Sequence, residues 1–469
     1  MKIFHISAEC YPIAKVGGLA DVVGALPKYQ NGLGHSSSVI MPFYDNKFTQ
    51  NNSFTTVYKD QIDFNGSQIS FKILKTTDDV LDFNTFFVDI PELLFKDYVY
   101  STDDTDRFLA FQIATLNWIL TLQALPEIIH CHDHHTGLIP FMLQESFRYK
   151  TLNTIPVVTT IHNAQYQGWF SYDKLHLIPE FDLNKTGLLD WDNSINPLAT
   201  AIKCAWRVTT VSPSYMEELK LEANGLQDLL KHESNKCVGI LNGIDTAVWN
   251  PETDHYIEEN YSINTVETGK LANKLALCKT FDLDVTKPLI AFIGRLVYEK
   301  GADVFPSALE KALVDKNCSV LVLGSGNADA EASLLQLKAK NKGYYNTFIG
   351  YDEKLSHNIY AGADFLLMPS RVEPCGLNQL YALRYGTIPV VRSIGGLKDT
   401  VVDISKKGGF GISHEQVTVE EIYQAIKRSV DLYHKTTIFK SLTKHIMTID
   451  HSWHVSANAY INLYQSLKK

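Results

Sequence analysis

Short apolar runs rich in β-branched residues alternate with longer stretches of helical periodicity along nearly the whole chain of 469 residues. In the first half these runs are KIFHIS, SSVIM, ISFKIL, TFFVDI, EIIHCH, PVVTTIH, RVTTVS and CVGIL. In the second half they are LIAFIG, SVLVLG, NTFIG, FLLMPS, IPVVRS and FGIS. We interpret them as strands. Because strands buried on both faces read as continuous apolar runs, the pattern favours parallel sheets.

The stretches between the strands predict helices. The clearest are RFLAFQIATLNWILTLQAL before EIIHCH, GADVFPSALEKAL, QLYALRYG and the closing segment HSWHVSANAYINLYQSLKK. The pattern stops and restarts around residues 250–286, where PETDHYIEENYSINTVETG is the best linker candidate. We therefore predict an α/β fold of two doubly wound domains. In such folds ligands bind beyond the carboxyl ends of the strands, here in a cleft between two facing sheets.

The charge balance and the cysteines narrow the class of protein. The chain carries 43 basic and 52 acidic residues, a net charge of −9, which gives no electrostatic footprint for nucleic acid or an anionic membrane. The seven cysteines are scattered without a Cys-x-x-Cys pair, which favours a reducing compartment over disulfides or a cysteine zinc site. The N-terminus lacks the apolar core of a signal peptide, and no segment has the roughly 20 apolar residues that span a bilayer. We therefore expect a cytoplasmic protein that binds neither nucleic acid nor membrane.

Two loops that follow strands combine glycine with basic side chains. In the first, Lys15 precedes Gly17 and Gly18, which open a helix whose N-terminus favours anionic groups. In the second, Arg295 and Lys300 follow the strand LIAFIG, where a guanidinium fork and a compact ammonium can converge on one diphosphate. Both loops also have a plainer interpretation, in which the glycines only make a tight turn and the cations are only solvated.

The stretch Glu373-Pro374-Cys375-Gly376 is the strongest single motif. Pro374 suits the first turn of the following helix, where its missing N–H costs nothing, and the amides of that turn can bind phosphate oxygens. Glu373 can accept hydrogen bonds from sugar hydroxyls, or it can simply complement the helix dipole. Cys375 by itself indicates a buried small residue rather than a nucleophile.

Two other motifs resemble known sites without fitting them. The loop that begins Gly324-Ser325-Gly326 starts like a dinucleotide fingerprint, but Asp329 replaces the third glycine, so an NAD-dependent oxidoreductase is only weakly supported. The run His130–His135 resembles the His-x-His-x-Asp-His signature of binuclear metallohydrolases, but Asp133 follows His132 with no spacer. Metal binding at this run is the less favoured interpretation. We expect instead that Asp133 lines the cleft.

Polar and aromatic residues follow two further strands. His162, at the end of PVVTTIH, is well placed to meet a substrate, or it can be a structural histidine. Tyr166, Trp169 and Phe170 follow it and can stack on sugar faces, although aromatic residues more often belong to a core. Asn242 follows CVGIL and can be either a turn residue or a cleft residue.

Together, the order and spacing of these motifs closely resemble the family of bacterial glycogen synthases and plant starch synthases. In the first half the shared motifs are Lys-x-Gly-Gly-Leu-Ala-Asp-Val at 15–22, His132-Asp133 with Gly137, His162-Asn163, and Asn-Gly-Ile-Asp at 242–245 running to Trp249-Asn250-Pro251. In the second half they are Gly-Arg-Leu at 294–296, Lys300-Gly301, Gly350-Tyr351, Ser370-Arg371-x-Glu373-Pro-Cys-Gly-Leu377, Tyr385-Gly386-Thr387 and Gly395-Gly396-Leu397. The resemblance covers essentially the whole chain.

The resemblance implies a glycosyltransferase B fold of two Rossmann-like domains facing a central cleft. The first domain would span residues 1–250 and hold the acceptor side, the second would span 251–451 and bind the nucleotide sugar, and helix 452–469 would pack back on the first. The implied reaction moves glucose from a nucleotide-glucose donor, usually ADP-glucose, to the non-reducing end of an α-1,4-glucan. It proceeds with retention of configuration and needs no metal or other cofactor.

The resemblance also implies a role for individual residues. The catalytic residues would be Lys15, Asp133, His162, Arg295, Lys300 and Glu373. The donor would contact Lys15, Gly17, Gly18, Asn242, Arg295, Lys300, Tyr351, Glu373, Cys375, Gly376 and Leu377, with Tyr351 packing on the base. The acceptor would contact Asp21, Tyr166 and Trp169.

Three departures from the family pattern concern the donor and acceptor contacts. Val16 replaces a frequent Thr, His134 stands where many members have Trp, and Asn378 stands where Thr is common. Four alternatives therefore stay open: UDP-glucose as donor, a retaining transferase with a small sugar acceptor, an inactive glucan-binding protein and a metallohydrolase. The sequence does not determine the oligomeric state.

Overall fold

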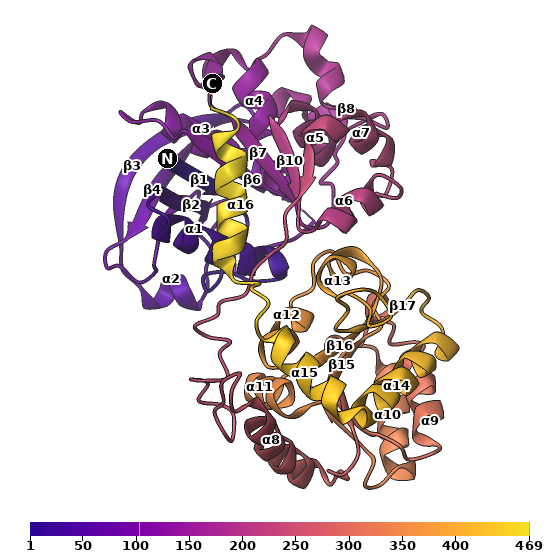
Figure 1. The fold of residues 1–469 in the computed structure, drawn as a ribbon. Coiled ribbons are helices and arrows are strands. Elements are labelled where there is room, and N and C mark those ends of the chain that lie inside the picture. The colour runs from indigo at the N-terminus through magenta and orange to yellow at the C-terminus, as the bar shows by residue number, and fades with distance from the viewer. Residues whose placement is uncertain (103, 469) are drawn as a thin grey trace. The chain divides into compact units, whose positions relative to one another are not determined.

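The computed structural model describes residues 1–102 and 104–468, which form two compact units. The first unit comprises Met1–Leu241 and Trp453–Lys469, and the second comprises Asn242–Ser452 (Figure 1). From the sequence, the boundaries are expected at 250/251 and 451/452. The closing helix, expected over 452–469, is α16 (Trp453–Gln465), and the expected end at residue 469 lies outside the described residues.

The first unit is built on a nine-stranded sheet of order β11-β10-β7-β6-β1-β2-β5-β4-β3. Its strands are β1 (Lys2–Ile6), β2 (Ser36–Pro42), β3 (Phe54–Phe64), β4 (Ser67–Thr76), β5 (Asn84–Asp89), β6 (Ile128–His132), β7 (Val157–Ile161), β10 (Arg207–Thr210) and β11 (Cys237–Gly239). All neighbours from β11 to β5 run parallel, whereas β3–β4 and β4–β5 are antiparallel. The parallel sheet that the pattern favours is present, and it carries an antiparallel edge at β4 and β3. The sequence analysis missed β3, because most of its residues are exposed and it carries no apolar run.

Helices cover both faces of this sheet. They are α1 (Gly18–Gly32), α2 (Lys47–Asn51), α3 (Asp104–Leu120), α4 (Ile139–Glu145), α5 (Pro197–Cys204), α6 (Pro213–Leu219), α7 (Gln227–His232) and α16. The unit also contains the short 3₁₀ turns η1 (His134–Thr136), η2 (Phe147–Leu152), η3 (Tyr172–Leu177), η4 (Leu183–Leu188) and η5 (Ser234–Lys236). A small ribbon pairs β8 (Asp190–Trp191) with β9 (Ser194–Ile195).

α3 was expected over 107–125 but ends at Leu120. The Thr121 hydroxyl caps its last turn by donating to the Trp118 carbonyl at 2.7 Å, and Pro126 disfavours helical backbone at the residue before it.

The second unit is built on a six-stranded, fully parallel sheet of order β14-β13-β12-β15-β16-β17. Its strands are β12 (Leu289–Ile293), β13 (Ser319–Gly324), β14 (Tyr345–Ile349), β15 (Phe365–Met368), β16 (Ile388–Arg392) and β17 (Ile412–His414). Its helices are α8 (Val266–Phe281), α9 (Phe305–Leu313), α10 (Ala328–Lys340), α11 (Glu353–Gly362), α12 (Asn378–Arg384), α13 (Gly395–Thr400), α14 (Val419–His434) and α15 (Thr436–Ile446), with the 3₁₀ turn η6 (Tyr298–Lys300).

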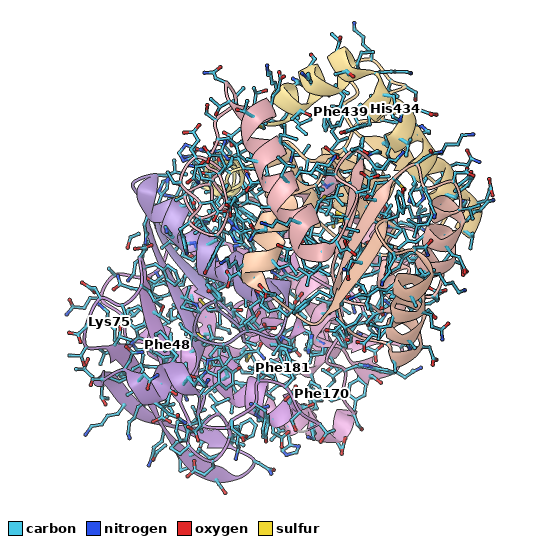
Figure 2. All side chains as sticks on the ribbon, turned by 90° about the horizontal axis from the view of Figure 1, so that it is seen from below. Phe48, Lys75, Phe170, Phe181, His434 and Phe439 are labelled. Carbon is cyan, nitrogen blue, oxygen red and sulfur yellow. The ribbon has the colours of Figure 1, made fainter. Side chains whose placement is uncertain are left out.

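Each sheet has hydrophobic clusters on both faces, and its strands contribute to clusters on either side. In β12, Ile290 and Phe292 belong to one cluster, while Leu289 and Ala291 belong to the cluster on the opposite face. Side chains fill the space between sheets and helices throughout each unit (Figure 2). Burial on both faces explains why the parallel strands read as continuous apolar runs. Among the described residues, no helix combines the length and apolarity needed to cross a membrane.

The last helix of the chain completes the first unit. α16 lies alongside α1 (Figure 1). Trp453, Tyr460 and Ile461 of α16 share a hydrophobic cluster with Val22 and Leu26 of α1. The segment 250–286, which the sequence predicts as a join, belongs to the second unit and includes α8.

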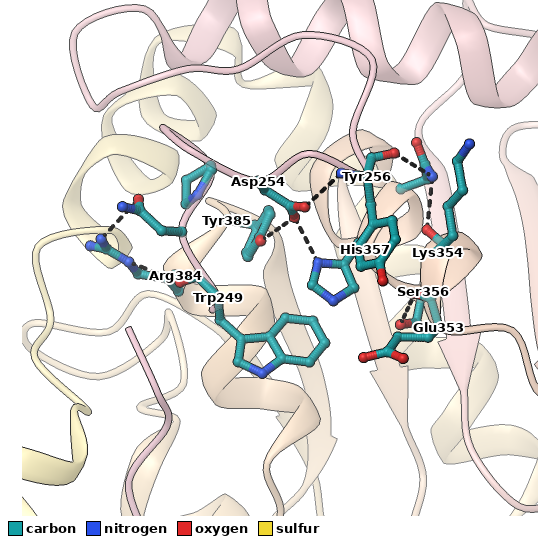
Figure 3. A network of polar contacts seen from close by, with 12 residues as sticks. Trp249, Asp254, Tyr256, Glu353, Lys354, Ser356, His357, Arg384 and Tyr385 are labelled. Carbon is teal, nitrogen blue, oxygen red and sulfur yellow. Dashed lines mark hydrogen bonds and ion pairs between the residues drawn. The ribbon is translucent and has the colours of Figure 1, made fainter. Parts of the chain in front are cut away.

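A buried polar network fixes the start of that segment to the second unit. Asp254 is 4% exposed, and its Oδ2 accepts hydrogen bonds from His357 Nδ1 at 2.6 Å and from the Tyr385 hydroxyl at 2.5 Å (Figure 3). The indole of Trp249 stacks between His357 and Tyr381, with ring centroids 4.0 and 3.8 Å away. Burial by itself would raise the pKa of Asp254, but the hydrogen bonds from His357 and Tyr385 outweigh it, so the pKa lies below its usual value.

We expect Asp254→Ala to lower the free energy of unfolding of the second unit by about 3 kcal/mol, because it leaves two buried donors without their acceptor. Urea denaturation of the full chain measures the change. Asp315→Ala is the matched control, since Asp315 is an exposed aspartate of the same unit, and it should shift stability by no more than about 0.5 kcal/mol. Equal stability of both variants would show that the network does not hold the segment.

Candidate active site

The loop after β1 is held by a buried carboxylate that the sequence analysis did not select. Glu9 Oε2 accepts from the backbone amides of Val16 at 2.6 Å and Gly17 at 2.9 Å, and Oε1 accepts from the Tyr100 hydroxyl at 2.5 Å. Glu9 is 3% exposed, so the loop is tied to the interior of the unit at this point. The amide of Gly17 is therefore already bonded within the unit.

Lys15 and the two glycines lie on the open side of this loop. The Lys15 ammonium pairs with Asp21 Oδ1 at 2.7 Å, and both side chains are partly exposed. A Cβ placed on Gly17 or on Gly18 would meet no heavy atom within 4 Å, and neither residue has positive φ. Neither the packing nor the backbone of this unit requires glycine there. The missing side chains therefore leave room for a ligand that approaches the loop from solvent.

Asp133 and His162 meet at the ends of the neighbouring strands β6 and β7. The backbone amide of His162 donates to Asp133 Oδ1 at 2.7 Å. Asp133 is 8% exposed and has φ +55°, an unfavourable backbone conformation for a residue other than glycine that is commonest at functional sites. Burial raises the pKa of Asp133 to about 7, against the lowering effect of the amides of His162 and Asn163. Burial lowers the pKa of His162 to about 3, so its ring is neutral.

Behind His162 lies a cluster of buried histidines. His5, His130 and His132 bring three ring nitrogens within 4.8 Å of one another, the geometry of a possible metal site. All six of their ring nitrogens, however, already have hydrogen-bond partners. A cation at this point would have to replace those hydrogen bonds, so the residues present fit a hydrogen-bonded core better than a metal centre.

A cavity of about 310 Å³ opens beside the turn η1. Tyr166 and Trp169, 60% and 66% exposed, are part of its lining. His134 and His135 also line it, and within the described part of the chain the buried Nδ1 of each has no hydrogen-bond partner. Exposed aromatic rings beside polar groups can bind the apolar faces and the hydroxyls of a sugar at the same time.

In the second unit, three of the predicted catalytic residues line one small cavity of about 170 Å³ at the carboxyl ends of β12 and β15. These are Arg295, Lys300 and Glu373, and Leu377 also lines it. The Lys300 ammonium lies 2.5 Å from Glu373 Oε2, which also accepts from the Ser370 hydroxyl at 2.9 Å. Lys300 is 23% and Glu373 10% exposed, so the pair is partly shielded from water.

The backbone around Glu373 differs from the prediction. α12 begins at Asn378, so Pro374 does not lie in its first turn as the sequence suggested. Gly376 explains this difference: its φ of +72° is left-handed, and the helix starts only after it. Gly396 fixes the loop from the other side, because its amide donates to the Glu373 carbonyl at 3.1 Å and a Cβ there would lie 2.0 Å from the Cys375 carbonyl oxygen.

Asn242 and Tyr351, the remaining residues predicted to bind the donor, also lie in the second unit. Asn242 is 8% exposed, and its backbone contacts Cys375. Its Oδ1 is buried with no hydrogen-bond partner among the described residues. Such an oxygen is costly unless a ligand or water pairs with it, which favours Asn242 as a binding residue over a turn residue. Tyr351 follows β14 and is 84% exposed.

Two family profiles match the chain. The profile of the starch synthase catalytic domain matches residues 2–232, and that of the glycosyl transferases group 1 matches residues 277–438. A glycogen synthase of Flavobacterium johnsoniae is 52% identical over 467 residues, which cover 99% of this chain and 98% of the relative. The chain belongs to the glycogen synthase and starch synthase family. A glycogen synthase of Hydrogenobaculum sp. is 37% identical over 100% of this chain and 99% of its own.

A solved structure of the family has the same architecture. The catalytic domain of starch synthase IV from Arabidopsis thaliana, bound to ADP and acarbose, has a TM-score of 0.86 and 32% identity, and the match covers 99% of each chain. A sucrose-phosphate synthase of Thermosynechococcus elongatus, 16% identical with a TM-score of 0.62, shares the fold alone. The resemblance inferred from the motifs is confirmed, and so is the glycosyltransferase B fold. Like the other members of the glycogen synthase family, the protein is a glucosyltransferase.

The sequence analysis missed residues that support the predicted ones. Glu9 holds the Lys15 loop, Ser370 holds Glu373, and His132 bonds the ring of His162. Glu9 had one visible signal, because a carboxylate two residues beyond the apolar run KIFHIS is expected to need a partner if it is buried. The roles of Ser370 and His132 depend on contacts between strand ends, which the sequence does not display.

We expect the free energy of unfolding to fall as the pH is lowered from 6.5 to 5. Burial lowers the pKa of His5 and His134 to about 4 and that of His162 to about 3, whereas an unfolded histidine titrates near 6.5. Below pH 6.5 the unfolded chain therefore binds protons that the native chain does not, and each histidine removes up to about 1.4 kcal/mol per pH unit. Asp133 has the opposite effect. Because its pKa is raised to about 7, the native chain binds a proton there that the unfolded chain does not, and this offsets the contribution of one histidine.

Urea denaturation at a series of pH values measures this slope. His162→Asn should make the slope shallower by the contribution of one histidine, which is up to about 1.4 kcal/mol per pH unit. His232→Asn, which replaces an exposed histidine, should leave the slope unchanged. Stability that does not change between pH 6.5 and 5 would contradict the neutral, buried state of these rings.

Proposed function

We propose that the protein transfers glucose from ADP-glucose to the non-reducing end of an α-1,4-glucan, with retention of configuration. The observation that carries this proposal is the cavity in the second unit, where Arg295, Lys300 and Glu373 converge at the carboxyl ends of two parallel strands. A guanidinium, an ammonium and a carboxylate suit a diphosphate beside a sugar. ADP is favoured as the leaving group because the Arabidopsis starch synthase, 32% identical over the whole chain, binds ADP.

Arg295 and Lys300 neutralise the charge that develops on the departing diphosphate. Lys300 can do so without releasing Glu373, because an ammonium has three donors and the Glu373 bond uses one. The ion pair also keeps Glu373 from being an unpaired buried charge before substrate arrives. The backbone around Gly376 and Leu377, next to Cys375, adds hydrogen bonds to phosphate. In the first unit, Lys15 and the space that Gly17 and Gly18 leave suit an anionic group of the donor.

Each unit offers polar groups that suit the hydroxyls of glucose. Glu373 accepts hydrogen bonds from its hydroxyls, and the unpaired Oδ1 of Asn242 is a further acceptor. Asp133 and His162 contact the sugar from the ends of β6 and β7. Tyr351, exposed after β14, packs on the nucleotide base.

The acceptor glucan binds at the cavity beside η1. Tyr166 and Trp169 stack on its glucose rings, and Asp21, which is partly exposed beside Lys15, accepts from its hydroxyls. His134, where many members of the family have Trp, lines the same cavity and offers a polar ring in place of an apolar one.

The reaction needs no metal or other cofactor in this proposal, because Arg295 and Lys300 supply the cations that balance the diphosphate. We also propose a cytoplasmic location. All seven cysteines are free thiols in the structure, which agrees with a reducing compartment.

The deciding experiment incubates the protein with glycogen and either ADP-glucose or UDP-glucose in the presence of EDTA, and follows nucleotide release and glucan growth. We expect growth with ADP-glucose. Growth with UDP-glucose alone would move the donor assignment to UDP-glucose, and loss of growth on chelation would overturn the metal-free reaction. No growth from folded protein with either donor would refute the glucan as acceptor, and small sugars would be tested next.

We expect Lys300→Ala to lower kcat by a factor of about 100 to 1,000, because a contact to transition-state charge in a shielded site is worth about 3 kcal/mol or more. Initial rates with saturating ADP-glucose and glycogen measure the loss. Lys311→Ala is the matched control: it removes another lysine–glutamate pair of the second unit, formed with Glu420 on the surface. Wild-type kcat in Lys300→Ala would remove Lys300 from the mechanism.

We expect Gly18→Ala to reduce kcat at least about tenfold while changing the free energy of unfolding by less than about 0.5 kcal/mol. The added methyl meets no atom of the unit, so only an approaching substrate can clash with it. Gly187→Ala, at another glycine with open space around its Cβ position, should change neither quantity. Full activity of Gly18→Ala would mean that the donor does not come close to this loop.

A further inference from the structure

A line of imidazole rings crosses the core of the first unit and ends at His162. His162 Nε2 lies 3.1 Å from His132 Nδ1, and His132 Nε2 lies 3.1 Å from His5 Nδ1. The rings belong to the ends of β7 and β6 and to β1, three neighbouring strands. His5 and His132 are fully buried, while His162 at the end of the line is only partly buried.

Each ring in the line has one donor and one acceptor. Burial lowers the pKa of His5 to about 4 and that of His162 to about 3, and it places the pKa of His132 well below its usual value. A neutral imidazole carries its single hydrogen on one nitrogen and a lone pair on the other. In a line of such rings, the tautomer of one ring therefore fixes the tautomer of the next.

The inner end of the line is the side-chain amide of Gln30 on α1, which is fully buried. Its Oε1 lies 2.8 Å from His5 Nε2 and 2.7 Å from the Ser37 hydroxyl, and its Nε2 lies 3.4 Å from the hydroxyl of Tyr464. A carbonyl oxygen can only accept, so His5 carries its hydrogen on Nε2. His5 Nδ1 then accepts from His132 Nε2, and His132 Nδ1 accepts from His162 Nε2.

We infer that Gln30, acting through His5 and His132, holds His162 in the Nε2–H tautomer, so that the ring offers the lone pair of Nδ1 to a hydroxyl of the transferred glucose. Gln30, His5 and His132 are then positioning residues of the transfer reaction. The inference rests on the proposed contact between His162 and the sugar. The direction of the hydrogen bonds in the line is a property of the protein alone and is testable without substrate.

His130 provides an internal comparison, because it lies on β6 two residues before His132 and is equally buried. Its ring bonds the Tyr464 hydroxyl at 2.7 Å and the Thr160 hydroxyl at 2.6 Å, and neither bond is to a ring of the line. Through Tyr464 it reaches only the amide nitrogen of Gln30, at 3.4 Å, whereas the Gln30 oxygen that bonds His5 is also held by the Ser37 hydroxyl. Replacing His130 or His132 thus removes a buried imidazole of the same strand and the same burial. Only His132 belongs to the line that orients His162.

Neutron diffraction from crystals of the deuterated wild-type protein, without substrate, tests the direction of the line. We expect deuterium on Nε2 of His162, His132 and His5, and none on their Nδ1 atoms. Deuterium on Nδ1 of His162 would overturn the inference, because the ring would then donate to the sugar. A metal ion at His5 and His132 would overturn it as well, since the hydrogens of the line would be displaced.

Kinetics of His132→Phe and His130→Phe test the consequence for transfer. We expect both variants to lose similar stability, but only His132→Phe to lose kcat/KM for the donor, about tenfold, with His130→Phe within about twofold of wild type. Equal losses, or no loss in His132→Phe, would show that the line does not orient a reacting group. If wild type transfers no glucose from any donor, the proposed function fails, and the neutron map by itself still decides the tautomer of His162.

Discussion

In both sheets the central strands run parallel, and parallel strands bring their carboxyl ends to the same edge. In the first unit β1, β6 and β7 are neighbours, so the Lys15 loop, Asp133 and His162 follow adjacent strands although about 150 residues of sequence separate the first from the last. In the second unit β12 and β15 are neighbours, and Lys300 reaches Glu373 across the same kind of edge. Every other feature of the candidate site depends on this pairing.

Buried polar groups then determine how rigidly each edge is held. An unpaired carboxylate or imidazole in these interiors would cost free energy. In the structure these groups have hydrogen-bond partners, which also fix the orientation of their side chains. Glu9 takes two loop amides and a tyrosine hydroxyl, while Glu373 takes Lys300 and Ser370 on a single oxygen. The candidate catalytic groups are consequently oriented before any ligand binds, which avoids reorganisation during the reaction.

The glycines of the family motifs serve two different purposes. Gly395 and Gly396 are required by packing, since a Cβ on either would lie about 2 Å from a carbonyl oxygen of the Glu373–Cys375 backbone. Gly17 and Gly18 are required by nothing in their own unit. Glycines of the first kind shape the site, and those of the second kind leave room for a substrate. Glycine thus has two different roles in these motifs, and only the atoms around each glycine distinguish them.

The sequence by itself determined the parallel strands, the family and most of the candidate residues. Strands that are buried on both faces have continuous apolar sequences, and each family motif is a short stretch that can be recognised locally. The sequence did not determine the antiparallel strand β3, whose exposed residues carry no such run, or the position of Pro374 outside α12, which depends on the left-handed Gly376. Only the tertiary structure decided that Ser370 supports Glu373 and that Gln30 ends the line leading to His162. Those contacts depend on which strands and helices are neighbours and in what register, and no local pattern encodes such long-range geometry.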